Sequence, residues 1–284
     1  MKRDKWLKQE IESMEGFLTL VEAYQEIAAV RMRKVKRSVL SRREFMQGLN
    51  EAFAYISYSY KVYRESLKES LKDTVLNTNG KTVSILLSSN TGLYGDVIRK
   101  TFDLFEKDIK DKETDIIVVG KMGKRFFDNS RLKNQYEYFE MTDKGIDEEN
   151  VSKLLEKVID YSDVIIYHGV FKSILSQSPN VTHVTGEVLK IEEDLSGYDT
   201  NFLFEPSVGK IAEHFEKQIT SLLFEQVVFE SSLSKYASRM VSLDSAADNI
   251  EKRLGKLDFK LKKTQHRNIN SNLQSSIFGG ILWS

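Results

Sequence analysis

One short segment of the chain has the residue types of a phosphate-binding loop. The sequence SSNTGLYGDVI, Ser88 to Ile98, directly follows the apolar run Val83–Leu87. An apolar strand, a glycine-containing turn and an amphipathic stretch are how nucleotide-binding βα units begin. The segment therefore raises the question of whether the chain binds a nucleotide.

The details of the segment do not match either known nucleotide fingerprint. A P-loop requires Lys and then Ser or Thr after its last glycine, whereas here Gly95 is followed by Asp96 and Val97. The dinucleotide pattern G-x-G-x-x-G is reduced to G-x-x-G at Gly92 and Gly95. The Asp96 carboxylate, near the N-terminus of the expected helix, interacts favourably with the helix dipole and repels an anion. We interpret the segment as a tight strand-to-helix turn and expect no nucleotide cofactor.

Other residues that could do chemistry are scattered. The absence of cysteine excludes disulfides and thiolate metal sites. The serines of FKSILSQS, Ser173 and Ser176, lack the pattern of a nucleophile elbow. The histidines lack metal-ligand spacing; they are His168, His183, His214 and His266. We therefore expect no catalytic residue and no metal site.

Charge is segregated although the totals balance at 42 basic and 42 acidic residues. A neutral chain is not a general nucleic-acid binder. Two segments, 31–43 and 252–267, are strongly basic. If they lie side by side they form a basic collar for an acidic partner; the alternative is a solvated face. The partner-binding residues predicted from them are Arg31, Arg33, Lys34, Arg37, Lys252, Arg253, Lys256 and Lys263.

The elements that position these residues begin with two long helices. Apolar residues recur at alternating spacings of three and four from Ile11 to Leu67, interrupted by Gln25 and Arg42, and again from Phe229 to Leu261. That mean spacing of 3.5 residues is typical of a coiled coil. Ordinary amphipathic bundle helices are the alternative, but these patterns far exceed three or four turns. Only two prolines occur in the chain, at 179 and 206.

The middle of the chain has a different pattern. Short apolar runs at 83–87, 115–120 and 163–167 alternate with amphipathic stretches near 96–110 and 148–160. That alternation predicts a small α/β domain with a mainly parallel, Rossmann-like sheet. Weaker strand patterns occur at 136–141, 181–188 and 201–204, and the acidic stretch 192–199 resembles a loop.

The predicted fold class is therefore α/β plus a long antiparallel coiled coil. The predicted divisions are an N-terminal helix at 1–76, a central domain at 80–204 and a C-terminal helix at 207–284. No apolar run reaches the roughly 20 residues that span a bilayer, and the N-terminus lacks the apolar core of a signal peptide. We expect a cytoplasmic protein without a direct membrane span.

Several segments of the chain match, in order, the motifs of one known protein family. The N-terminal pattern IxS…A…AAxxMRK is matched by Ile11, Ser13, Ala23, Ala28, Ala29, Met32, Arg33 and Lys34. The other segments are LSSNTGLYGD (87–96), VVGKMGKRFF (118–127), FKSILSQ (171–177), FLFEPS (202–207) and SRMVSLDSAADNI (238–250). Together these segments resemble the γ subunit, or central shaft, of F-type rotary ATP synthases, and the resemblance extends over nearly the whole chain.

This resemblance implies a role as well as a fold. The paired terminal helices would stand as one shaft inside a hexameric ring of F1-type α and β ATPase subunits, with an ε-like or other subunit at the base. Nucleotide sites would belong to the ring, and the complex would be peripheral to the membrane. The basic collar would attract acidic lever segments of the ring. The C-terminal tip would enter its apolar sleeve through Ile269, Leu273 and Ile277.

Two segments depart from the family. The stretch FLTLVEAY (17–24) replaces TQKITKAM, and Gln265-His266 replaces Arg-Gln. We expect these positions to contact the ring, and their divergence suggests a specialised F1-like motor, for example one that drives surface motility. The other hypotheses are a structural coiled-coil scaffold with an attached domain and a small-molecule enzyme.

Overall fold

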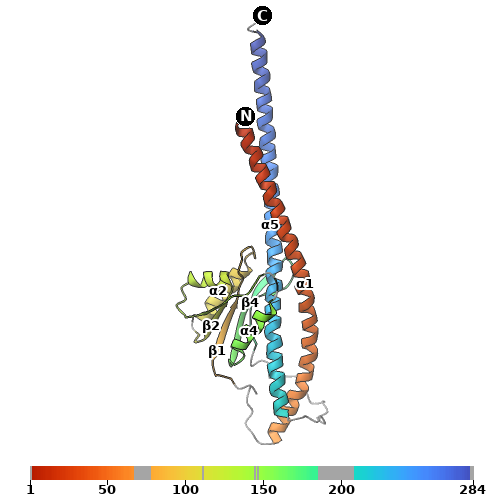
Figure 1. Ribbon diagram of the computed structural model, residues 1–284, viewed down its shortest axis with the longest axis vertical. Helices are drawn as coiled ribbons and strands as arrows, with labels where there is room; N and C mark the ends of the chain where they lie inside the picture. Colours follow the sequence, from red (N-terminus) through yellow and green to blue (C-terminus); the bar gives the residue numbers. More distant parts are fainter. Residues whose placement is uncertain are drawn as a thin grey trace. The chain divides into compact units, whose positions relative to one another are not determined.

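In sequence order, the chain begins with one very long helix, continues through a five-stranded sheet with its short helices, and ends with a second very long helix. The computed structural model describes residues 2–66, 78–110, 112–143, 145, 147–184 and 208–281 (Figure 1). Helix α1 is Lys2–Ser66 and helix α5 is Val208–Ile281. The predicted loop at 192–199 and the predicted strand at 201–204 lie outside the described residues.

The chain divides into two compact units. The first comprises Met1–Ala28 and Met240–Ser284, and the second comprises Ala29–Arg239. Each unit contains a stretch of α1 and a stretch of α5, and the second also contains the sheet domain.

In the first unit, α1 and α5 pair antiparallel. Gln25 Nε2 donates to Asp244 at 3.0 Å, and Arg253 pairs with Glu10 at 2.7 Å. The lower-numbered residue of α1 thus pairs with the higher-numbered residue of α5, as in an antiparallel pair. The seam residues Leu7, Leu243 and Leu257 are buried. The polar seam position Gln25 is therefore satisfied by a partner across the pair, as a register-setting polar residue requires.

In the second unit the same seam is better buried. Met32, Val35, Val39 and Met46 of α1 are each at most 7% exposed. Facing residues of α5 include Phe229, which carries the Arg42 guanidinium 4.1 Å above its ring. Arg42 also pairs with Glu225. The second polar seam position is thus a paired cation whose guanidinium lies over an aromatic ring.

The sheet has the order β3-β2-β1-β4-β5. Its strands are β1 Thr82–Leu87, β2 Asp115–Val119, β3 Glu137–Phe139, β4 Asp163–Phe171 and β5 Gln177–His183. The first four are parallel, whereas β5 pairs antiparallel with β4. Pro179 lies in β5, an edge strand, where a missing backbone donor is tolerated. This confirms the Rossmann-like domain and the strand predicted at 136–141. The strand predicted at 181–188 begins earlier, as β5 at Gln177, and residues 185–188 lie outside the described residues.

Side chains alternate between the two faces of the sheet, and each face has its own helices. On one face, Ile85, Ile117 and Ile166 pack against α4, which is Glu148–Val158, and against α5. On the other face, Leu86, Val118 and Tyr167 pack against α2, Val97–Ile109, and α3, Lys121–Asp128. The long helix α5 therefore supplies part of a domain core as well as a coiled-coil seam.

Helix α3 was not among the predicted elements. It has only eight residues and contains Gly123, which lowers helix propensity. A Cβ at Gly123 would lie 2.8 Å from the Cβ of Ser88, so the glycine permits close packing of the helix on the end of β1. Tertiary packing rather than local preference explains this helix.

Candidate partner-binding surfaces

The glycine turn lies at the carboxyl edge of the sheet, beside the point where strand order reverses between β1 and β4. Doubly wound sheets bind ligands at that edge. Here α5 lies against it, because Lys235 Nζ donates to Ser88 O at 3.0 Å and Ser238 Oγ donates to Tyr94 O at 2.6 Å. A Cβ at Gly169 would meet Ser234 Oγ at 2.7 Å. This geometry supports the interpretation of the turn as scaffold.

Asp143 joins three segments at this junction. Its carboxylate accepts from the backbone N–H groups of Asn90 and Thr91 at 2.7 and 2.8 Å, and from the Thr91 hydroxyl at 3.0 Å. Its carbonyl oxygen accepts from Arg31 Nη1 at 3.3 Å and from the Tyr236 hydroxyl at 2.9 Å. The turn after β1, helix α1 and helix α5 thus meet at one residue.

Burial changes the ionisation of groups along the same junction. Desolvation lowers the pKa of Lys235, although the negative charge of Asp143 opposes this effect. Burial, with a smaller contribution from Asp143, raises the pKa of Tyr94 to about 12. The Arg239 guanidinium lies 4.7 Å from the centre of the Tyr94 ring. Sequence reasoning missed Asp143 and Lys235 because neither belongs to a recognisable motif.

The first basic segment divides into two faces. Arg31 is part-buried at the Asp143 junction, whereas Arg33, Lys34 and Arg37 are exposed. Arg43 pairs with Glu230 at 2.6 Å. Three of the four predicted partner-binding residues of this segment are therefore available to a partner, and Arg31 serves the fold.

The second basic segment lies in the first unit. Lys252, Arg253, Lys256 and Lys263 are all exposed, and so are Gln265 and His266. Arg253 is the member that pairs across to α1, at Glu10.

The expected coincidence of the two basic segments is wrong. Residues 31–43 face 225–236 of α5, through Arg42–Glu225, Arg43–Glu230 and the shared contact of Arg31 and Tyr236 with Asp143. Residues 253–268 instead face 4–10 of α1. The register of the pairing gives each basic segment a different opposite segment, so they do not ring one level.

The C-terminal tip keeps apolar residues in contact with solvent. Ile269, Leu273 and Ile277 are 54%, 57% and 61% exposed. Asn268 Nδ2 donates to Asp4 at 2.7 Å, close to the first residue of α1. Beyond that point α5 continues without α1 opposite it.

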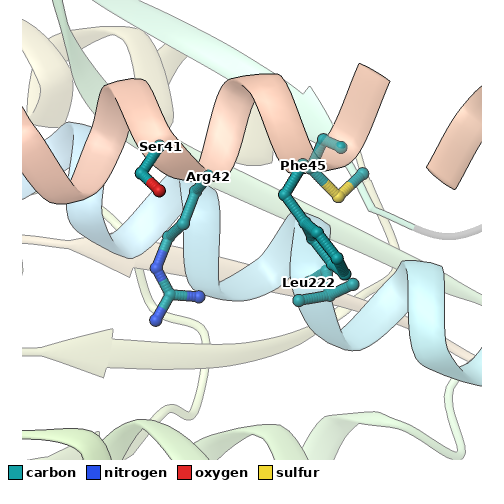
Figure 2. Close-up of a pocket in the computed structure, with 5 residues that line it drawn as sticks. Ser41, Arg42, Phe45 and Leu222 are labelled. Atoms are coloured by element: carbon teal, nitrogen blue, oxygen red, sulfur yellow. The ribbon is translucent and has the colours of Figure 1, made fainter. Parts of the chain in front are cut away.

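Two apolar features of α1 were not predicted. Phe17, Leu20, Tyr24 and Ile27 form an exposed stripe at spacings of three and four, and the first three lie within the stretch that departs from the family. In the second unit, a cavity of about 220 Å³ lies between α1 and α5. Figure 2 shows Phe45 of α1 extending to Leu222 of α5 at this cavity.

The serines and the possible metal ligands noted in the sequence can be placed within the described residues. Ser173 and Ser176 form the turn between β4 and β5, where Ser173 Oγ accepts from the Ser176 N–H at 3.1 Å. In the part of the chain that the structure describes, no three His, Cys, Asp or Glu side chains gather as a metal site requires. None of the described helices has both the length and the apolar character of a membrane span.

Comparison with known proteins gives consistent matches over almost the full length. A family model described as ATP synthase matches residues 4–281. The ATP synthase gamma chain of Bdellovibrio bacteriovorus is 25% identical, with 97% of each chain covered. That of Geotalea daltonii is 23% identical, with 97% of this chain and 96% of the relative covered.

Solved structures agree on the fold. A rotor chain of the Euglena gracilis mitochondrial ATP synthase superposes with a TM-score of 0.63 at 16% identity, covering 94% of this chain and 99% of the other. A chain of the Tetrahymena thermophila central stalk and c-ring structure gives 0.55 at 16% identity, covering 80% and 99%.

Proposed function

This chain belongs to the ATP synthase gamma-chain family, and we propose that it is the central rotor shaft of an F1-like rotary ATPase. The observation that carries the proposal is the family match over residues 4–281. It coincides with a fold in which α1 and α5 pair antiparallel in the first unit and pack against each other in the second.

The geometry suits a subunit that transmits force without doing chemistry. Buried apolar seams hold α1 and α5 together, and satisfied polar positions at Gln25 and Arg42 favour a single register. The junction at Asp143 ties the sheet domain to both helices. ATP binding and hydrolysis would occur in the surrounding subunits, so we assign this chain a non-catalytic role.

The proposed partners are α and β ATPase subunits arranged as one ring around a single shaft, with an ε-like or other subunit at the base. The exposed cations Arg33, Lys34 and Arg37 would face acidic surfaces of the ring. The second basic segment would do the same through Lys252, Arg253, Lys256 and Lys263.

The tip is the third proposed contact. Exposed Ile269, Leu273 and Ile277 would lie in an apolar sleeve of the ring, beside Gln265 and His266. None of the described helices covers this apolar stripe, and burying it against a partner removes the free-energy cost of its contact with water. The complex would be cytoplasmic and peripheral to the membrane.

Native mass spectrometry of the purified complex tests the proposal. We expect one copy of this chain per ring of several larger ATPase subunits. A homo-oligomer without ATPase partners would favour the scaffold alternative, and equal numbers of this chain and the ATPase chains would exclude a central shaft.

A further inference from the structure

An open groove lies on the outer face of the sheet domain, between α2 and the end of α3. Its volume is about 310 Å³. It belongs wholly to the second unit and uses none of the residues assigned to the ring contacts above. The opposite face of the sheet is the one that α4 and α5 cover.

The lining of the groove is basic. Arg99 and Lys110 come from α2 and its end, and Arg131 comes from the turn after α3; Glu106 is the one acid among the lining residues. Residues 121–133 contribute further positive charge nearby, because they contain five basic residues and one acid, Asp128.

Two of these cations are unpaired in the part of the chain that the structure describes. Among the described residues, the side chains of Lys110 and Arg131 have neither a hydrogen bond nor an ion pair, and both are exposed. By contrast, Lys121 is neutralised by Glu140 at 3.0 Å, and Lys100 by Asp96 at 2.5 Å. The groove thus has uncompensated positive charge, whereas the cations at Lys121 and Lys100 nearby are paired with acids.

Arg99 is held in a fixed position over an aromatic floor. Its guanidinium lies 5.2 Å from the centre of the Phe126 ring and 5.8 Å from that of Phe102. It pairs with Asp103 through Nε at 2.9 Å, so its charge is partly compensated and the unpaired positive charge of the groove comes from Lys110 and Arg131. A planar guanidinium stacked on rings binds carboxylates with little further loss of freedom.

We propose that this groove binds an acidic peptide segment of a partner protein. Cation clusters containing arginine are a recurring way of recognising acidic motifs. A small anionic ligand fits less well, because such ligands are bound where most of their surface is buried, and this groove is open. The inference is independent of the rotor assignment, because it depends only on residues 99–131.

The absence of cysteine allows a local test on the full-length chain. An environment-sensitive fluorophore is attached at Asn129→Cys, a groove residue, and an octaglutamate peptide is titrated. We expect a saturable change in emission that weakens with added salt. Because the dye reports only its surroundings, peptide bound to the basic segments of α1 or α5 does not produce this signal.

A matched pair of double variants identifies the binding residues. Lys110→Glu with Arg131→Glu should weaken the peptide at least tenfold. Lys107→Glu with Lys133→Glu makes the same charge change at exposed positions that do not line the groove, and should stay within twofold. If the first pair lowers the thermal midpoint, Lys110→Gln with Arg131→Gln replaces it.

Three results would overturn the proposal: no saturable response, equal weakening by both double variants, or ATP displacing the peptide at equal concentration. The last result would identify a site for small anions. None of these results bears on the subunit stoichiometry, which is what native mass spectrometry measures to test the rotor assignment.

Discussion

At the level of single residues, Asp143 is the polar centre of the junction between the sheet domain and the helices. Five hydrogen bonds converge on it, three at the carboxylate and two at the carbonyl oxygen. Two of the carboxylate bonds come from backbone N–H groups that would otherwise need another acceptor.

Replacing Asp143 by Ala should destabilise the chain by about 1–2 kcal/mol, since it removes three hydrogen bonds, of which the one to the Asn90 N–H is part-buried. Urea unfolding of the full-length chain measures the change. Glu149→Ala is the control, because it removes an exposed pair with Lys153 that contributes little. Equal effects of the two substitutions would show that the junction adds no stability.

His168 should make the chain sensitive to mild acid. Burial lowers its pKa from 6.5 to about 4. Its Nδ1 faces the Gly169 carbonyl, which can only accept, so Nδ1 carries the proton and Nε2 accepts from the Thr182 hydroxyl at 2.9 Å. The folded chain therefore holds this imidazole neutral.

Because the folded pKa lies below the unfolded value, the stabilisation is present above pH 6.5 and is lost as pH falls toward 4. Between pH 7 and pH 5 the loss is roughly 2 kcal/mol. A His168→Gln variant should lack this component of the pH dependence of unfolding. Parallel pH profiles for the two proteins would contradict the assignment.

At the level of elements, α5 has two packing roles. Phe224, Val227 and Val228 belong to the core on one face of the sheet, whereas Phe229, Leu233 and Tyr236 continue the seam that faces α1. Close approach of α5 to β4 depends on Gly169, since a Cβ there would lie 2.7 Å from Ser234 Oγ and 2.9 Å from Val97 Cγ2.

A Gly169→Ala substitution should therefore separate α5 from β4 and cost about 1–3 kcal/mol, as overpacking does. Thermal unfolding of the sheet domain, followed by near-ultraviolet circular dichroism, measures it. Gly92→Ala is the matched control, because a Cβ there meets no atom within 4 Å. A larger effect at Gly92 would mean that the turn, not the helix contact, is the sensitive point.

At the level of the whole molecule, the exposed cations of α1 can bind a partner and are expected to contribute little to the stability of the fold. Replacing Arg33, Lys34 and Arg37 together by Glu should leave the thermal midpoint nearly unchanged, since surface substitutions stay within about 0.5 kcal/mol each. On the proposed function it should lower torque or ATP turnover of the assembled motor, and the defect should depend on salt.

The control for this triple variant is Lys107, Lys124 and Lys133 replaced by Glu, which changes the charge equally on the sheet domain. Unchanged rotation and turnover in the α1 variant would remove the electrostatic contact and leave the rotor assignment intact. A defect of the same size in both variants would indicate a general charge effect.

The sequence by itself determined the long helices and the strand-helix alternation, because hydrophobic periodicity reports local geometry directly. The spacing from Ile11 onward predicted the α1 seam, and the apolar runs predicted β1, β2 and β4. The polar interruptions at Gln25 and Arg42 were visible as well, although their partners Asp244 and Glu225 were not.

Only the tertiary structure decided which distant segments meet. The register that places residues 31–43 opposite 225–236 depends on how seams interlock, so the expectation of one basic collar was wrong. The junction at Asp143, the contact of Lys235 with Ser88 and the groove between α2 and α3 likewise join residues far apart in the chain. No local periodicity encodes such contacts, because they arise from the packing of complete elements.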